Sequence, residues 1–440
     1  MNYRLVSTLY KKEVATGMLG LYNPIKGHNF AFVSENLFKK LQNNSFRDIS
    51  GLEGLVEKNF VVQKDFSERN YFESLKSNLK KEIHLMYLLL TQGCNLACGY
   101  CFENICERAE LNKEEETMPW EVADKAIDHF FNIALPERKV IFYGGEPLMN
   151  KEVFVDSVKK IKEKDNSYKD KTNLSMVTNG TLIDYELAKF IKDNNVNVAV
   201  SIDGPEEIHN QARVNLAGNG SYYGALRGYN LLKDIGAVHA ISCTVGKHNV
   251  NHLEEVARFF VNELKPSSVG FNFMITRELS GNKFECGIEE ATDAVLKAFK
   301  ILRDNGIYED RIMRRLEPIT DNKFHLKDCA AYGNQIVVRY DGMVGPCHAF
   351  SRSQIYFEGN VLDSSFGIGN ETFDSWTKRS QLNNLECKDC PVILLCGGGC
   401  AYNSYVNKGD INEIDTNICE HTKKLIGWIL DETWKTKKLN

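Results

Sequence analysis

Short runs of apolar and β-branched residues alternate with amphipathic stretches along the middle of the chain. The apolar runs predict six strands, at residues 85–91, 140–143, 173–177, 198–202, 239–244 and 269–273. Between them, apolar residues recur at helical spacing, for example Val122, Ala126, Ile127 and Phe130. Strands that alternate with helices are typical of parallel βα units. The pattern therefore predicts an α/β fold, a partial (β/α)6 barrel similar to a TIM barrel, with its functional groups at the carboxyl ends of the strands.

The two ends of the chain depart from this pattern. Residues 1–80 predict a small winged-helix-like domain, and a charged helix over residues 66–81 leads from it to the first barrel strand. Its expected elements are a hairpin through residues 20–33, helices at 35–42 and near Leu52, and a strand at 60–62. Beyond about Lys323 the chain is rich in cysteines and loop-forming residues. We therefore expect three domains, at residues 1–80, 81–310 and 311–440.

Composition and charge narrow the class of protein. With 440 residues, 43% hydrophobic and 26% charged, the chain has the composition of a folded protein, and intrinsic disorder is disfavoured. The net charge of -5 gives no electrostatic basis for binding nucleic acid or an anionic membrane. The polar start Met1–Arg4 is no secretion signal, and the longest apolar run, Leu85–Leu90, is too short for a membrane span. We expect a cytoplasmic protein.

Thirteen cysteines change this picture, because a chain of this size needs no disulfides to fold and carries no sign of secretion. Three of them, Cys94, Cys98 and Cys101, form a CxxxCxxC loop immediately after the first predicted strand. A structural zinc site takes four protein ligands, whereas three thiolates on a 4Fe-4S cluster leave one iron open to an outside ligand. The spacing therefore favours an iron–sulfur cluster with a free coordination position.

This loop resembles the CxxxCxΦC loop of the radical S-adenosylmethionine (radical SAM) superfamily, which follows the first strand of a partial barrel; Tyr100 stands at the aromatic position. The resemblance implies that the open iron binds the amino and carboxylate groups of S-adenosylmethionine (SAM). It also implies that the reduced cluster cleaves SAM to a 5'-deoxyadenosyl radical, which abstracts hydrogen from the substrate. The cofactor then supplies the difficult chemistry, and the protein positions it.

Residues at other predicted strand ends match the SAM-binding motifs of the same superfamily. At the second strand end, glycines permit close backbone approach and a carboxylate is suited to meet the SAM ammonium. The resemblance implies that Ser201 and Arg213 bind the ribose or the carboxylate of SAM. Singly, such residues are also typical of ordinary turns. The candidate SAM-binding residues, in order, are Tyr100, Gly144, Gly145, Glu146, Pro147, Thr178, Asn179, Ser201, Asp203 and Arg213.

The carboxyl-terminal part of the chain carries seven further cysteines, Cys329, Cys347, Cys387, Cys390, Cys396, Cys400 and Cys419. Their spacing resembles that of the SPASM domain, which follows radical SAM barrels in peptide- and protein-modifying enzymes and carries two auxiliary 4Fe-4S clusters; a zinc ribbon is the alternative. The resemblance implies one cluster on Cys387, Cys390, Cys396 and Cys419, and another on Cys329, Cys347 and Cys400. The second set lacks a fourth cysteine, because Lys323 stands where some relatives have one. That iron is then open, or bound by substrate, water or another side chain.

Three cysteines lie outside these sets. Cys243 falls in a predicted strand and is expected to be buried packing, and Cys106 is expected to be incidental. Cys286, in the loop at residues 281–287, is either a bystander or a further ligand or acid–base group at the barrel mouth.

The segment Pro346-Cys347-His348 distinguishes two classes of SPASM enzyme. Sulfatase maturases, which oxidise cysteine or serine to formylglycine, characteristically carry an aspartate after this cysteine as the proposed base. A histidine at this position makes the segment similar to the corresponding segment of ribosomal-peptide maturases, which form thioether or carbon–carbon cross-links. His348 is therefore the candidate catalytic base, and packing beside the cluster is its alternative role.

The winged-helix-like domain also resembles the precursor-recognition elements of peptide maturases, which bind a leader peptide as an added strand; a structural cap is the alternative. We therefore favour a radical SAM oxidoreductase that uses SAM and three 4Fe-4S clusters to cross-link a cysteine-rich, ribosomally made precursor peptide. A flavodoxin or ferredoxin would donate electrons. An anaerobic sulfatase-type maturase is the first alternative, and a non-enzymatic zinc or electron-transfer protein is a distant one.

Overall fold

The computed structural model describes residues 2–46, 49–102, 116–274, 282–363 and 367–439. The chain divides into two compact units. We call the first the terminal unit, because it contains both chain ends; it consists of Met1–Lys80, Ile312–Cys329 and Lys378–Asn440. The second, the barrel unit, consists of Lys81–Arg311 and Ala330–Thr377.

The barrel unit is built on a parallel sheet whose central strands follow one another in sequence order. All the strands predicted for the middle of the chain are present, each within two residues of its predicted ends. Their parallel register brings their carboxyl ends to one edge of the sheet. These strands are β6 (Leu85–Thr91), β7 (Lys139–Gly144), β8 (Asn173–Thr178), β9 (Val196–Ser201), β10 (His239–Val245) and β11 (Ser268–Phe273).

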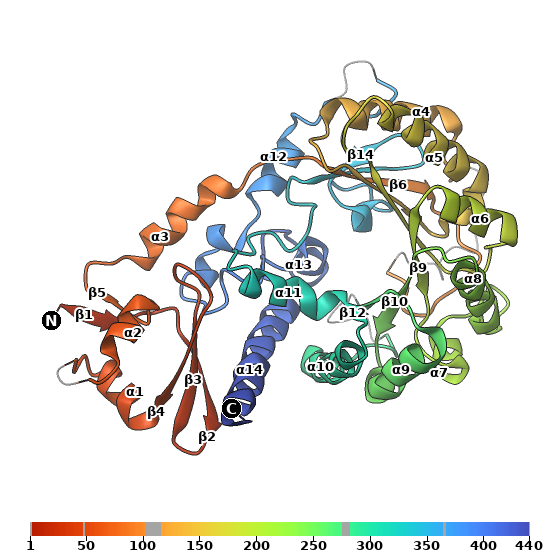
Figure 1. The fold of residues 1–440 in the computed structure, drawn as a ribbon. Helices are drawn as coiled ribbons and strands as arrows, with labels where there is room; N and C mark the ends of the chain where they lie inside the picture. The colour runs from red at the N-terminus through yellow and green to blue at the C-terminus, as the bar shows by residue number, and fades with distance from the viewer. Residues whose placement is uncertain (1, 47–48, 103–115, 275–281, 364–366, 440) are drawn as a thin grey trace. The chain divides into compact units, whose positions relative to one another are not determined.

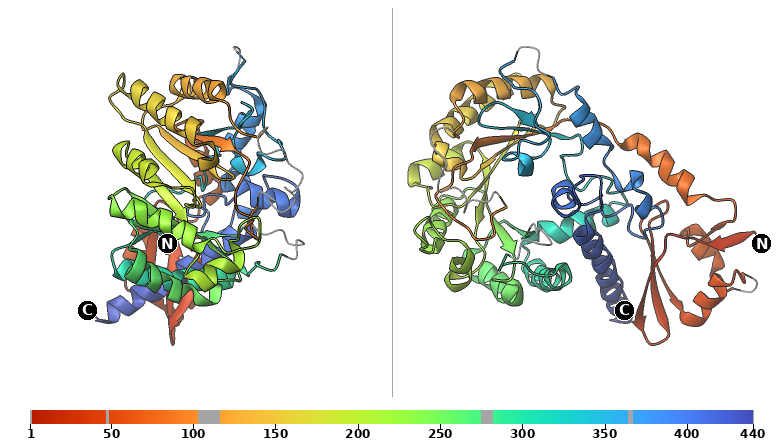
Figure 2. Two further views of the ribbon diagram at one scale, coloured as in Figure 1. Left: turned by 90° about the vertical axis from the view of Figure 1, so that its right-hand side faces the viewer. Right: turned by 180° about the vertical axis from the view of Figure 1, so that it is seen from behind.

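Amphipathic helices connect these strands and lie along the outer face of the sheet (Figure 1; Figure 2). In α4 the apolar residues predicted at helical spacing are buried, as Val122, Ala126, Ile127 and Phe130 show. These helices are α4 (Trp120–Ile133), α5 (Lys151–Asp165), α6 (Tyr185–Asp193), α7 (Glu206–Ala212), α8 (Tyr222–Asp234), α9 (Leu253–Phe259) and α10 (Ile288–Asp304). The unit also contains most of α12 (Glu371–Lys378), the short 3-10 helices η3 (Pro147–Asn150), η4 (Val250–His252) and η6 (His348–Phe350), and a π-helical segment η5 (Phe260–Leu264). Among the described residues, no helix is long and apolar enough to span a membrane.

The sheet extends beyond the predicted strands at both edges. β12 (Tyr308–Glu309) joins β11, β13 (Gln335–Val338) runs parallel to β6, and β14 (Val344–Gly345) pairs antiparallel with β13. β13 and β14 lie in the region beyond about residue 323 that was expected to be rich in loops, and these two short strands were not predicted. Two- and four-residue strands are too short to show an alternating pattern, which is why the sequence did not reveal them.

The terminal unit contains the hairpin and the short helices predicted for residues 1–80. β2 (Tyr10–Ala15), β3 (Met18–Asn23) and β4 (Asn29–Ser34) form an antiparallel sheet, and β1 (Tyr3–Leu5) pairs with β5 (Val61–Gln63). β1 and β2 were not predicted. The helices are α1 (Glu35–Gln42), α2 (Leu52–Glu57), α3 (Glu68–Leu75), α11 (Asp310–Thr320, which begins in the barrel unit), α13 (Ala401–Lys408) and α14 (Thr416–Leu439), with turns η1 (Lys76–Asn78), η7 (Gln381–Asn383) and η8 (Leu385–Cys387).

Residues from the two ends of the chain share one core in this unit. Tyr22 of β3 packs with Ile426 and Leu430 of α14, and Lys12 forms an ion pair of 2.5 Å with Asp431. The predicted first domain is thus joined to the carboxyl-terminal segment by apolar burial as well as by charge. The division into domains at 1–80, 81–310 and 311–440 stays a prediction.

Candidate active site

The cysteine loop follows β6 at the carboxyl edge of the sheet. Cys94, Leu96 and Cys98 form one buried group, and Tyr100 and Cys101 pack against it. The described side chains include no set of three or more His, Cys, Asp or Glu residues arranged around a single metal ion. A cluster of several irons has a different requirement, namely soft thiol donors gathered in one sheltered group, and these cysteines meet it. Their assignment as ligands stays a prediction.

The glycines after β7 bring two backbone segments into close contact. Gly145 donates its N–H to Thr91 O at 2.9 Å, and Glu146 donates to Gly93 O at 2.8 Å. A Cβ on Gly144, whose φ is +137°, would lie 2.2 Å from Thr91 O, and one on Gly145 would lie 2.1 Å from Gly93 O. The glycines are therefore required for contact with the start of the cysteine loop.

The Glu146 carboxylate is almost fully buried and ties β7 to β8. It accepts hydrogen bonds from Thr178 Oγ1 at 2.7 Å, Asn179 N at 2.7 Å and Leu148 N at 3.1 Å. Burial raises the pKa of Glu146, and these hydrogen bonds oppose that rise without cancelling it. Pro147 begins the η3 turn behind it. The predicted contact of Glu146 with the SAM ammonium stays a prediction; the visible role of the carboxylate is to fix two strand ends.

A pair of asparagines links the cysteine loop to β8. Asn179 donates from Nδ2 to Asn95 Oδ1 at 2.8 Å, and Asn95 donates from its own Nδ2 to Thr181 Oγ1 at 2.9 Å. Asn179 Oδ1 in turn accepts from Thr181 N at 2.9 Å. Asn179 was a candidate from the sequence, whereas Asn95 and Thr181 were missed because neither residue type stands out beside the cysteines.

Asp203, which follows β9, is the centre of a buried polar network. Its Oδ2 accepts from the Tyr100 hydroxyl, from Arg213 Nε at 2.9 Å and from His248 Nε2 at 3.3 Å. Thr244 N donates to Oδ1 at 2.9 Å. Burial alone would raise the pKa of Asp203, but the charge of Arg213 and the hydrogen bond from His248 together outweigh burial and hold that pKa well below its usual range. The network brings together three of the residues that the sequence predicted for SAM binding.

Ser201 lies at the carboxyl end of β9 and is buried to 8% exposure. Two other neighbours of the network were not predicted. His248 stacks on Tyr100, with ring centroids 5.4 Å apart, and Phe284 packs edge-on against both rings. His248 lies shortly after β10, the fifth central strand. Asp203 was predicted because it follows a strand in the same way, so the same reasoning would have identified His248.

His348 begins the η6 turn directly after Cys347 and sits among aromatic rings. It stacks on Tyr87 and meets Tyr143 edge-on, each with centroids 5.0 Å apart, and Phe102 lies at 6.1 Å. Burial lowers the pKa of His348 to about 4, so the ring is neutral near pH 7. A neutral imidazole is able to accept a proton, and its role as base stays a prediction.

Four of the remaining candidate ligands are neighbours within the terminal unit. Burial, together with the charges of the other thiols, raises the pKa of Cys387, Cys396 and Cys419 to about 12, and Cys390 contributes to each of these shifts. Gly398 N also donates to Cys396 Sγ at 3.4 Å. The set that the SPASM resemblance implied for one auxiliary cluster is therefore gathered in space.

The second auxiliary set is divided between the two units. Cys329 and Cys400 belong to the terminal unit and are electrostatic neighbours, whereas Cys347 belongs to the barrel unit. Of the cysteines outside the sets, Cys243 is fully buried on β10, as expected for packing. Burial raises the pKa of Cys286 to about 11, and Cys106 lies outside the described residues.

Comparison with known proteins identifies the barrel. Residues 88–260 match the radical SAM superfamily. The radical SAM cyclopropyl synthase TigE of Paramaledivibacter caminithermalis is 25% identical over 448 aligned residues, which cover 95% of this chain and 90% of TigE. The cysteine-type anaerobic sulfatase-maturating enzyme of Clostridium perfringens is 28% identical over 328 residues, covering 70% of this chain and 86% of the relative.

The fold is also similar to that of a solved structure. The structure described as native anSMEcpe with bound AdoMet superposes with a TM-score of 0.69 at 25% identity, over 80% of this chain and 99% of the other. The buried thiols of the loop are suited to the iron–sulfur cluster that this superfamily uses together with SAM. The sequence match, the partial barrel and the cysteine loop lead to one conclusion: residues 88–260 form a radical SAM domain, in a chain that is similar to anaerobic sulfatase maturases and to a radical SAM cyclopropyl synthase.

Proposed function

We propose that this enzyme is a peptide maturase that installs an oxidative cross-link, a thioether or a carbon–carbon bond, in a ribosomally made precursor peptide. This proposal rests on how much of the chain aligns with each of two relatives, the cyclopropyl synthase and the sulfatase maturase. The alignment with the cyclopropyl synthase covers 95% of this chain and so includes most of residues 1–80, whereas the alignment with the sulfatase maturase covers 70%. The relative whose name denotes ring-closing chemistry therefore shares the region that we expect to recognise a precursor.

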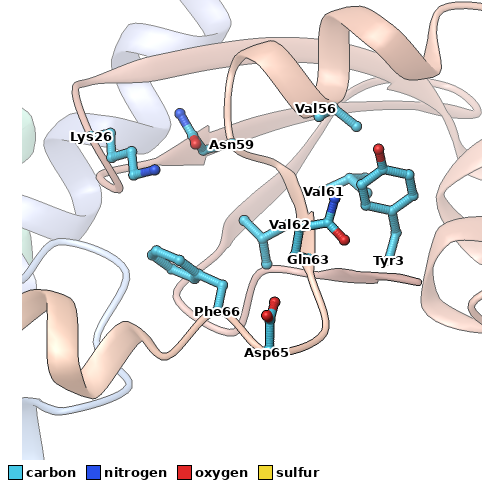
Figure 3. Close-up of a pocket in the computed structure, with 9 residues that line it drawn as sticks. All are labelled: Tyr3, Lys26, Val56, Asn59, Val61, Val62, Gln63, Asp65 and Phe66. Atoms are coloured by element: carbon cyan, nitrogen blue, oxygen red, sulfur yellow. The ribbon is translucent and has the colours of Figure 1, made fainter. Parts of the chain in front are cut away.

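The terminal unit offers a site for that precursor. A cleft of about 360 Å³ runs beside β5, whose residues Val61, Val62 and Gln63 line it together with Phe66 and others (Figure 3). Across from Phe66 in the close-up, Tyr3 and Val56 form the other side (Figure 3). A mainly apolar cleft with a few polar groups is typical of a site for a peptide or small ligand.

One edge of β5 is suited to accept a further strand. Val6 N bonds to Phe60 O and Lys64 N bonds to Asn2 O, both at 3.0 Å, so even-numbered residues face β1. In an antiparallel pair the intervening residues, Val61 and Gln63, turn their backbone N–H groups to the opposite edge. Among the described strands, β5 pairs only with β1. A leader peptide that adds as a strand along this edge would gain main-chain hydrogen bonds.

Changing Gln63 to proline tests this site. Proline removes the outward N–H of an exposed residue without removing a hydrogen bond to β1, and we expect leader affinity to fall about fivefold to tenfold, the effect of about 1 kcal/mol for one hydrogen bond. The measurement is fluorescence anisotropy with the leader segment of a precursor peptide encoded beside this gene. Gln63→Ala, which loses the same side chain but keeps the N–H, should bind the leader more tightly than Gln63→Pro. Equal affinity of the proline and alanine variants would contradict strand addition at this edge.

In the barrel, Cys94, Cys98 and Cys101 would hold the radical cluster, and bound SAM would supply a hydrogen-abstracting radical after reduction by a flavodoxin or ferredoxin. Forming one cross-link removes two hydrogens from the peptide. One would leave as a hydrogen atom to the radical that SAM supplies, and the other as a proton and an electron, for which an auxiliary cluster held by the carboxyl-terminal cysteines would be the acceptor. His348, neutral and partly buried among aromatic rings, is the proposed acceptor of that proton.

A second function, oxidation of a cysteine or serine to formylglycine, is favoured by the similarity in sequence and fold to a sulfatase maturase. The two functions differ in product. A cross-link removes two hydrogens and leaves no aldehyde, whereas formylglycine carries an aldehyde that reacts with hydrazide reagents. The substrate residue at the reaction centre is a thiol or an unactivated carbon in the first case and a single cysteine or serine in the second.

The deciding experiment is co-expression of the enzyme with any short cysteine-rich peptide encoded beside its gene, followed by intact-mass measurement. Peptide maturation predicts loss of two hydrogens for each cross-link, with fragmentation blocked between the linked residues. Peptide of unchanged mass, from an enzyme that cleaves SAM, would contradict the proposal. Hydrazide-reactive product from a sulfatase-derived peptide would establish the second function instead.

A further inference from the structure

Arg213 lies directly opposite Cys98 in a short antiparallel pairing. Gly99 N donates to Ala212 O at 2.9 Å, Ala97 N donates to Val214 O at 2.7 Å, and Leu96 forms a bridge with Asn215. These contacts define a register in which Cys98 and Arg213 are cross-strand partners. Such partners between hydrogen-bonded pairs carry their side chains on one face, in close contact.

The Arg213 side chain is held in this place from several sides. Its Nε donates to Asp203 at 2.9 Å, and its guanidinium carbon lies 5.3 Å from the centre of the Tyr100 ring. Its backbone carbonyl accepts from both the N–H and the hydroxyl of Ser221. Burial raises the pKa of the Cys98 thiol, and the nearby charge of Arg213 opposes that rise. Arg213 is 7% exposed, so water screens this charge little.

We infer that Arg213 sets the reduction potential of the radical cluster by placing a fixed, buried positive charge beside the Cys98 sulfur. A reduced cluster carries one more negative charge than an oxidised one, so a nearby cation stabilises the reduced form. The net charge of the surroundings and hydrogen bonds to the sulfurs are the terms that tune such potentials. Asp203 is then a positioning residue, which aims the guanidinium and partly balances its charge.

This role differs from the one implied by family resemblance, in which Arg213 binds the ribose or carboxylate of SAM. The difference is measurable, because a charge that acts on the cluster shifts the potential when no SAM is present. The inference rests on the radical SAM assignment and does not depend on the identity of the peptide substrate.

The test is a reductive titration of the reconstituted full-length enzyme, followed by electron paramagnetic resonance. The radical cluster is identified as the signal that changes on adding SAM, and its potential is then measured without SAM. For Arg213→Gln we expect a more negative potential, by at least the tenfold change in equilibrium constant that equals about 59 mV for one electron. Asp203→Asn, which removes the balancing negative charge, should shift the potential in the opposite direction. Arg213→Lys, which keeps the charge, should stay closer to the unchanged enzyme than Arg213→Gln.

Arg138→Gln is the matched control. Arg138 is another buried arginine of the barrel unit, 4.0 Å from the buried Asp165, but it precedes β7 and so lies at the opposite end of the strands. Its removal should leave the potential unchanged. A SAM-free potential unaltered in both Arg213→Gln and Asp203→Asn would overturn the inference, whether or not SAM affinity falls. If one of the two variants does not assemble the cluster, the direction of the shift in potential in the other variant still tests the inference.

Discussion

Alanine in place of Cys98 is expected to abolish SAM cleavage while leaving the protein folded. Cys98 is the middle thiol of the loop, buried to 8% exposure, and its loss would leave two cysteines for a cluster that needs three. The side chain is small, so the cavity that remains costs little stability compared with the loss of the cluster. Formation of 5'-deoxyadenosine after reduction should fall to background, and iron should fall by about four per chain, the content of one 4Fe-4S cluster.

Cys243→Ala is the control for this change. Cys243 is fully buried on β10 and lies outside every predicted ligand set, so its replacement removes a thiol of the same kind without removing a ligand. We expect SAM cleavage and iron content to match those of the unchanged enzyme. Retention of SAM cleavage by the Cys98 variant would overturn the assignment of the radical cluster to this loop.

The strands and helices of the barrel were predictable because each has a strong period of its own. Runs such as residues 85–91 are almost entirely apolar, as is typical of strands covered on both faces, and the intervening helices show one apolar face. The strands at the sheet edges had no such signal. β13 gains its place by pairing with β6, a contact between residues about 250 apart, and no local pattern encodes that pairing.

The candidate site was predictable to the extent that its residues follow strands. Gly144, Thr178 and Asp203 all come at the ends of central strands, and the parallel register brings them to one edge. The sequence could not show which partners these residues contact in the folded protein. Glu146 and Asp203 each accept several hydrogen bonds from within the protein, and those partners are set by tertiary contacts.

The terminal unit shows the same limit on a larger scale. Local patterns correctly predicted α1 and the hairpin of β3 and β4, because capping and turn residues act over a few positions. The shared core of Tyr22 with Ile426 and Leu430 joins residues about 400 apart. The amphipathic face of α14 predicts burial but does not identify the surface that buries it.

The close backbone contact beneath the cysteine loop leads to the second large expected effect, a loss of stability in Gly145→Ala. The added Cβ would lie 2.1 Å from Gly93 O and 2.7 Å from Gln92 O, so the backbone must move and the hydrogen bond from Glu146 N to Gly93 O must lengthen. Overpacking against backbone atoms costs roughly 3 kcal/mol, because no side-chain rotation relieves it. Thermal unfolding should shift to lower temperature by several degrees, and iron content should fall as the loop loses its support.

Gly270→Ala separates this effect from the general cost of a methyl group in the sheet. Gly270 lies in β11, and a Cβ there would meet nothing closer than 3.9 Å. Alanine at this position should leave the melting temperature unchanged or raise it slightly, since it loses less backbone entropy on folding than glycine. If both variants melt together and hold equal iron, the contact between Gly145 and Gly93 does not constrain the loop. A low melting temperature with reduced iron in Gly145→Ala alone would show that the β7 turn supports the cysteine loop.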